Sequence, residues 1–252
     1  MAMYVPLREG HYRATEHTQG PWDPRTQHLG PVTALIVHEL ARTAPRPGLG
    51  LAKLNVDVFA PVPVAELAVR TEVVRDGKRV QCLAASVSSG GREYVRATAW
   101  RIREAETPGA RRPPPPLPPR EDAPSWLSTG FGYGRATEWR FTRGSPDETG
   151  PAAAWGRARV PLVRDEEITP LERLALFADC GNGISYTLPF DGYLFVNVDL
   201  VISLFRAPVG EWICLDAETV VGPSGRGLAR STLYDVDGEI GSASQTLFVS
   251  PR

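Results

Sequence analysis

Apolar residues in the first half of the chain follow one helical pattern and then a series of alternating patterns. Between residues 30 and 43 they recur at helical spacing, and a proline and glycine cluster at residues 45–48 ends the predicted helix. Alternation with a period of two then predicts half-buried strands at residues 54–58, 67–73, 83–87 and 95–99. Turn signals at Asp76-Gly77 and Gly90-Gly91 indicate that neighbouring strands are antiparallel hairpins.

The second half of the chain repeats this order of elements. Residues 169–172 match a capping box with proline at the first helical position, and residues 181–183 end or interrupt that helix. Strands are predicted at residues 193–205, 211–221, 227–236 and 239–249. Pro61 returns as Pro208 and Ala97 as Ala243, so the offset stays near 147 residues. A period this long predicts two fused domains that can pack about an approximate twofold axis.

A proline-rich segment joins the two copies. Residues 107–124 contain eight prolines, a density that excludes a helix or paired strand and predicts a stiff, extended spacer. We therefore expect a first repeat at residues 1–106, a linker at 107–124 and a second repeat at 125–252.

Composition narrows the class of protein and its partners. The 42% hydrophobic and 23% charged residues are typical of a soluble globular protein. Basic and acidic residues number 28 and 29, so we expect no nucleic acid or membrane partner. Three widely spaced cysteines fit neither a disulfide framework nor a zinc site, and the N-terminus lacks the apolar run of a signal peptide. We expect a cytoplasmic protein without a metal or cofactor.

One helix followed by a long antiparallel sheet is the element order of a hot-dog fold. Two copies predict an α+β double hot-dog, and the plainer alternative is an unspecified pair of α+β domains. Seven strings spread along the chain add a family signal: GPWD (20–23), QHLGP (27–31), FAPVP (59–63), EWRF (138–141), ADCGNG (178–183), NVDL (197–200) and QTL (245–247). In their order and spacing the chain resembles type II acyl-CoA thioesterases with a double hot-dog fold, especially an actinobacterial thioesterase-like branch.

The resemblance implies hydrolysis of an acyl thioester, carried by coenzyme A or a carrier protein, in a chain that can form homo-oligomers. It implies a catalytic aspartate, threonine and glutamine, which fall by motif on Asp199, Thr219 and Gln245. The carboxylate would activate water that the two neutral side chains hold at reacting distance. Backbone N–H groups at the helix start near Gly30 would stabilise the oxyanion, and His28 beside them is either a residue that contacts substrate or, as is more common, a hydrogen-bonded loop histidine.

The strand pattern supports these residues unequally. Thr219 and Gln245 are polar groups on largely apolar strand faces, so each needs a partner, which could be nearby backbone alone. Asp199 lies on the face opposite the apolar residues of its strand and could be a solvated carboxylate. Asp179, near the end of the second helix, is either a second carboxylate of the site or a helix-end residue bonded to the following turn.

Other functions remain as alternatives. A non-catalytic acyl-ligand binder would keep the pocket without turnover. A hot-dog hydratase would need a histidine paired with an aspartate, yet all four histidines precede residue 39 and the second copy has none. An α/β-hydrolase is disfavoured because its histidine should come last and no Gly-x-Ser-x-Gly is present.

Differences between the copies predict the number of sites. At the repeat offsets, Ala52 stands where the second copy has Asp199, and Ala99 stands where it has Gln245. Alanine can neither activate nor orient water, so we expect one productive site per chain.

Overall fold

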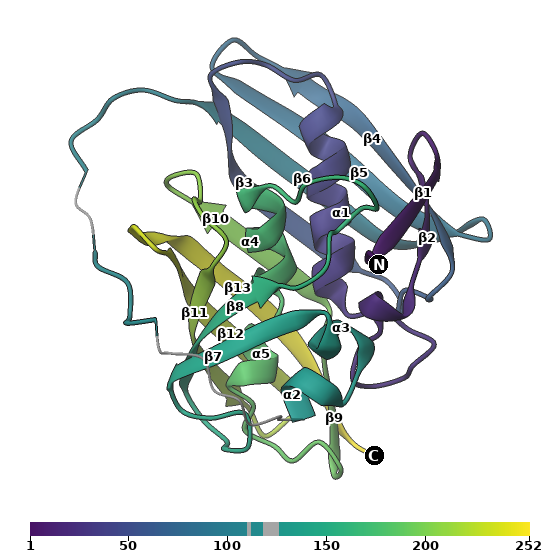
Figure 1. The fold of residues 1–252 in the computed structure, drawn as a ribbon, viewed down its shortest axis with the longest axis vertical. Helices are drawn as coiled ribbons and strands as arrows, with labels where there is room; N and C mark the ends of the chain where they lie inside the picture. The colour runs from purple at the N-terminus through teal and green to yellow at the C-terminus, as the bar shows by residue number, and fades with distance from the viewer. Residues whose placement is uncertain (110–111, 118–125) are drawn as a thin grey trace.

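The computed structural model describes residues 1–109, 112–117 and 126–252, and one long antiparallel sheet encloses the two longest of its described helices (Figure 1). The first half contains β1 (Tyr4–Arg8), β2 (His11–Ala14), a short 3-10 helix (Glu16–Thr18), α1 (Leu29–Arg42), β3 (Leu49–Val58), β4 (Glu66–Asp76), β5 (Val80–Ser89) and β6 (Arg92–Arg103). The second half contains α2 (Trp126–Thr129), α3 (Gly132–Arg135), β7 (Thr137–Arg143), β8 (Ala152–Ala158), α4 (Pro170–Ala178), α5 (Gly181–Ile184), β9 (Tyr193–Asn197), β10 (Asp199–Leu204), β11 (Ile213–Val221), β12 (Arg226–Asp235) and β13 (Gly238–Pro251).

The strand order of the sheet is mirrored about its centre. It runs β1-β2-β4-β5-β6-β3-β10-β13-β12-β11-β8-β7, so each strand of the first half has a counterpart in the second, and β9 pairs with β13 off this path. The halves join where β3 pairs with β10, with Leu54 opposite Ile202. Each half curves around its own long helix, α1 or α4 (Figure 1). The predicted double hot-dog fold is confirmed.

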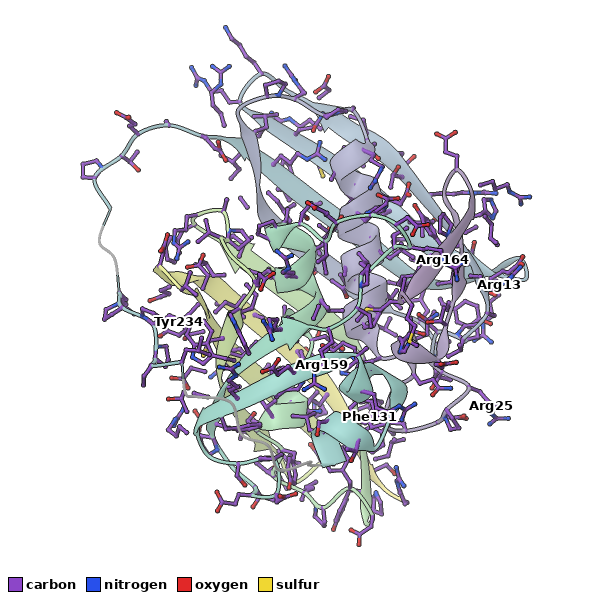
Figure 2. The ribbon with its side chains drawn as sticks, viewed as in Figure 1. Arg13, Arg25, Phe131, Arg159, Arg164 and Tyr234 are labelled. Atoms are coloured by element: carbon purple, nitrogen blue, oxygen red, sulfur yellow. The ribbon has the colours of Figure 1, made fainter. Side chains whose placement is uncertain are left out.

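Helices α1 and α4 pack against each other inside the sheet, where side chains fill the space between the layers (Figure 2). Thr169 and Glu172 form the predicted capping box at the start of α4, with Pro170 in its first turn. A Cβ atom at Gly30 would collide with the carbonyl oxygen of Leu176. Only glycine therefore permits this approach, which places the start of α1 beside the end of α4.

The proline-rich segment runs outside the sheet where the structure describes it (Figure 1). The carbonyl oxygen of Arg112 accepts a hydrogen bond from the Glu239 amide at 3.0 Å, and that of Pro116 accepts one from the Trp155 indole at 3.2 Å. Residues 110–111 and 118–124 of the predicted linker lie outside the described residues. The division of the chain into residues 1–106, 107–124 and 125–252 stays a prediction.

The strand predicted at residues 193–205 is broken at Val198, and this break changes which residues face inward. The Val198 amide bonds to Thr246 of β13, while its carbonyl oxygen bonds to Val58 of β3, so Val198 belongs to neither β9 nor β10. Phe195 and Leu200 are both buried although they lie five positions apart, a spacing that puts residues of an unbroken strand on opposite faces, and Val198 is 45% exposed. The uninterrupted alternation that we expected is therefore wrong, and Asn197 and Asp199 lie on different faces.

Four strands at the two ends of the sheet, β1, β2, β7 and β8, were not predicted. β8 illustrates the reason, since its first five residues are all buried. A strand covered on both faces shows no alternation. Within the described ranges, no helix is both long and apolar enough to cross a membrane.

Candidate functional site

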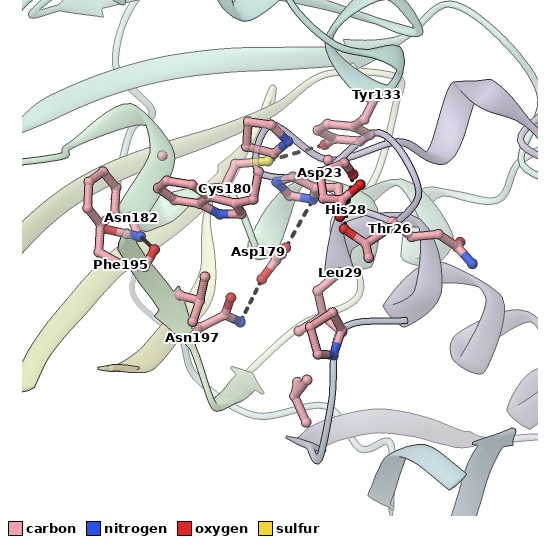
Figure 3. A pocket seen from close by; sticks show the side chains of 18 of the residues that line it. Asp23, Thr26, His28, Leu29, Tyr133, Asp179, Cys180, Asn182, Phe195 and Asn197 are labelled. Carbon is pink, nitrogen blue, oxygen red and sulfur yellow. Dashed lines mark hydrogen bonds and ion pairs between the residues drawn. The ribbon is translucent and has the colours of Figure 1, made fainter. Parts of the chain in front are cut away.

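A cavity of about 370 Å³ lies where the start of α1 meets the end of α4 (Figure 3). Both repeats line it. The first contributes Trp22 and His28 from the segment before α1, and the second contributes Asp179, Asn197 and Gln245. The close approach of the helices at Gly30 is thus what assembles the cavity wall from the two copies.

Asp179 is the buried carboxyl group at the centre of this wall. It forms the C-cap of α4 and is 6% exposed. Its Oδ1 accepts hydrogen bonds from Asn197 Nδ2 and Gln245 Nε2, both at 3.0 Å. Burial raises the pKa of Asp179 to about 7, because desolvation outweighs the amide donors that favour the ionised form. A carboxyl group with such a pKa exchanges its proton near neutral pH.

Gln245 holds its position through bonds at both ends of its amide. Its Nε2 donates to the carbonyl oxygen of Asp179 at 2.9 Å, and its Oε1 accepts from the backbone amide of Asn182 at 3.0 Å. These backbone partners determine the orientation of the side-chain amide. Gln245 therefore ties β13 to the end of α4 and presents an N–H group to the Asp179 carboxyl group.

His28 reaches the same carboxyl group from the first repeat. Its Nδ1 lies 3.0 Å from Asp179 Oδ2 and accepts a hydrogen bond from the Gly30 amide at 3.0 Å. The imidazole ring stacks on Tyr133 with centroids 4.3 Å apart. Burial lowers the pKa of His28 to about 3. The absence of histidine from the second copy therefore does not exclude a histidine–aspartate pair, because the first copy supplies the histidine.

The sequence-predicted residues do not all meet in this cavity. Gln245 lines it, whereas Asp199 and Thr219 are not among the described residues that do. Asp199 Oδ1 accepts the backbone amide of Thr246 at 2.6 Å. Thr219 is buried behind α5, where its hydroxyl bonds to that of Ser185 at 2.8 Å.

Asn197 is the polar residue of the cavity that sequence reasoning missed. It stands two positions before Asp199 in the NVDL string, and alternation placed both on one face. The break at Val198 separates them and turns Asn197 toward Asp179. The NVDL string therefore indicated the right part of the chain, but only the structure shows that Asn197 is the residue of the string that faces the cavity.

Aromatic side chains form an apolar wall beside the polar centre. Trp22 contacts Phe195 edge-to-face at a centroid distance of 4.9 Å, and Phe190 packs on both. This wall can hold an apolar group close to Asp179. In the described part of the chain, no cluster of three or more His, Cys, Asp or Glu is arranged to hold a metal ion.

The start of α1 points its backbone N–H groups toward this centre. The amides of Leu29 and Gly30 lie close enough to Asp179 to favour its ionised form. Helix N-termini favour developing negative charge in the same way. The expected role of Gly30 in binding an oxyanion stays a prediction.

Two family models match this chain. The model of the acyl-CoA thioesterase N-terminal domain matches residues 18–102, and that of the C-terminal domain matches residues 108–249. A search of curated proteins finds no match.

Several solved structures share the fold at low sequence identity. A hot-dog protein of unknown function from Alicyclobacillus acidocaldarius is 16% identical with a TM-score of 0.76, and the alignment covers 95% of this chain and 92% of that one. A putative thioesterase II from Thermobifida fusca is 16% identical with a TM-score of 0.74 and coverage of 98% and 95%. The acyl-CoA thioesterase II TesB2 from Mycobacterium marinum is 15% identical with a TM-score of 0.70 and coverage of 99% and 95%.

Proposed function

Because the chain belongs to the acyl-CoA thioesterase family, we propose that it hydrolyses acyl thioesters at the centre formed by Asp179, Asn197 and Gln245. The observation that carries this assignment is the buried Asp179 carboxyl group, held by two amide donors at the wall of an apolar cavity. The sequence-based set shared only Gln245 with this centre. We expect the substrate to be a thioester of coenzyme A or a carrier protein, in the cytoplasm.

Each part of the cavity has a place in the reaction. The aromatic wall at Trp22 and Phe195 takes the acyl group, and the start of α1 faces the thioester carbonyl oxygen. Asp179 supplies the basicity of the site, since a base is most useful when its pKa lies near the working pH. The products are the free acid and the thiol.

The experiment compares two aspartate variants on a panel of acyl-CoAs, with thiol release as the readout. Asp179→Asn keeps the side-chain volume and should lower kcat by about 10²- to 10⁴-fold, the usual contribution of acid–base catalysis. Asp199→Asn is the matched control and should stay near wild type, because its carboxylate bonds a strand amide outside the cavity. The opposite ranking would restore Asp199 as the catalytic residue. Acyl-CoA binding without thiol release in the wild type would favour a non-catalytic binder.

The opposite end of the helix pair supports the proposal of one site per chain. At that end the start of α4 is capped by Thr169, which corresponds to His28 at the start of α1. The end of α1 is capped by Thr43, which corresponds to Asp179 at the end of α4. Ala99 holds the position of Gln245 in the mirrored sheet. Titration with a non-hydrolysable acyl-CoA analogue should therefore give one bound ligand per chain, with a dissociation constant equal to the inhibition constant of the same analogue. Two equivalent binding sites would contradict this.

The contact between His28 and Asp179 favours a second candidate, hydration of a 2-enoyl thioester. Such a pair can deliver water to a conjugated double bond as well as to a carbonyl carbon. Loss of enoyl absorbance without thiol release would identify this reaction, and thiol release from saturated acyl-CoAs would identify hydrolysis.

A further inference from the structure

His28 lies beside Asp179 in the cavity, and its role in the proposed hydrolysis can be inferred from its contacts; this inference rests on that proposed function. We infer that His28 is a catalytic residue, whose Nε2 takes the proton of the attacking water while Asp179 holds the ring through Nδ1. The active site is then shared between the repeats, with the proton acceptor in the first and its partner in the second.

The contacts of the ring leave only one nitrogen for chemistry. Nδ1 is engaged by Asp179 and by the Gly30 amide. Nε2 has no hydrogen-bond partner within the described part of the chain. His38 offers a comparison, because its Nε2 also has no hydrogen bond but is buried in the core, 3.8 Å from Glu166 Oε2. The His28 ring instead lines the cavity, and its side chain keeps 15% of its exposure, so Nε2 is available to a water molecule or substrate.

Among the titratable groups that line the described cavity, only Asp179 is placed to exchange a proton with the His28 ring. The other titratable groups of the described cavity lining are Asp23, Tyr133 and Cys180. Burial raises the pKa of the Tyr133 hydroxyl and of the Cys180 thiol well above their ordinary values, so both stay neutral. Asp23 is paired at 2.7 Å with Arg25, which lies at the edge of the molecule (Figure 2). Asp179 is therefore the group that exchanges a proton with His28.

The pair of side chains holds its protons as one unit. In the state with the larger number of protons, the Asp179 carboxyl group carries the proton shared across the 3.0 Å contact with Nδ1, and the ring proton lies on Nε2. When the pair loses one proton, the shared proton moves to Nδ1 and Asp179 becomes ionised. The Leu29 and Gly30 amides are placed to stabilise that carboxylate. Nε2 is left bare and becomes a base.

The reaction balances with water as the only co-reactant. A water O–H proton moves to His28 Nε2 as the water oxygen bonds to the thioester carbonyl carbon, and the C=O electron pair moves to oxygen. The Asp179 carboxylate stabilises the imidazolium so formed. The C=O bond then re-forms, the C–S bond breaks, and the leaving sulfur takes the proton from Nε2. The acid and thiol leave, and the pair returns to its starting state.

The first test replaces His28 by asparagine. Asparagine is a favoured N-cap residue, so it keeps an acceptor for the Gly30 amide but has no Nε2. We expect kcat to fall by about 10²- to 10⁴-fold with little change in KM. His11→Asn, at a histidine outside the cavity, is the matched control and should keep wild-type kcat.

The second test separates catalysis from capping and stacking. His28→Gly leaves a space over the Tyr133 ring that free imidazole can occupy. Added imidazole should restore thiol release in this variant, and the restored rate should follow the fraction of neutral imidazole as pH changes. The same imidazole should not restore Asp179→Asn. A residue that acts only by shape would show no rescue.

The outcomes distinguish this inference from the proposed hydrolysis. A wild-type protein that releases no thiol from any acyl thioester would overturn the proposed function. A wild type that is active, together with a His28→Asn variant of unchanged kcat and pH profile, would overturn only the role of His28. If His28→Asn fails to fold by circular dichroism, rescue of His28→Gly by imidazole decides, and lack of rescue overturns the inference.

Discussion

Replacing Asp179 by asparagine should stabilise the folded protein at alkaline pH while it removes activity. Burial raises the pKa of Asp179 from its ordinary value of 3.8 to about 7. Its ionised form is therefore destabilised in the folded state relative to the unfolded chain. The difference of about 3 pKa units, at 1.36 kcal/mol each, corresponds to about 4 kcal/mol.

The sign of the pH dependence follows from the direction of the shift. A carboxyl group whose folded pKa is raised contributes stability that is fully present below its unfolded pKa and is lost as pH rises through the folded value. Asparagine does not titrate and resembles the protonated carboxyl group. The variant should thus exceed the wild type by about 1 kcal/mol at pH 4.5 and by about 4 kcal/mol at pH 8, because the loss is complete above pH 7.

Urea denaturation of both proteins across this range measures the difference. Every titrating group except Asp179 is common to both chains, so the difference at each pH reports Asp179 together with its coupling to His28. A gain that does not grow between pH 4.5 and pH 8 would refute the burial argument. A loss of stability at pH 8 would refute it as well, and would indicate that the ionised carboxylate is a net stabilising group.

Three further predictions concern the same cavity. The value of kcat/KM should rise with pH through about 7 as Asp179 ionises, and a flat profile from pH 5 to pH 9 would contradict the need for an ionised Asp179 in the reaction. Gly30→Ala should lower the free energy of unfolding by about 1 to 3 kcal/mol, because the new methyl group meets the Leu176 carbonyl oxygen. Gly183→Ala, with open space around it, is the control in the same denaturation series. Trp22→Ala should raise KM for acyl-CoAs about 10-fold or more while kcat changes less, and equal KM values would remove Trp22 from the acyl wall.

Local patterns in the sequence predicted most of the fold because they are short-range physical signals. Alternation identified the central strands of both repeats, and the capping box located the start of α4. β8 was not predicted because it is buried on both faces and shows no alternation. The break at Val198 was not predicted either, and it reverses which residues face inward in a strand that alternation indicated to be continuous. The repeat of the sequence was sufficient for the double hot-dog, since each copy carries its own patterns.

The candidate site depended more strongly on tertiary structure. Gln245 was predicted from the family motif, and its place on an apolar strand face added that it needs a partner, which the structure shows to be Asp179. The family motif pointed to Asp199, and neither periodicity nor spacing reveals that a break at Val198 turns Asn197 toward Asp179.

What the sequence by itself determined is the local character of each element: its periodicity, its caps and its repetition in a second copy. Only the tertiary structure decided that His28 meets Asp179 across 151 positions, as their numbers give. That contact exists because Gly30 lets α1 approach the carbonyl of Leu176, so the two helix ends enclose one apolar cavity. The same burial that this packing imposes shifts the pKa values of both side chains, and no local pattern contains that information.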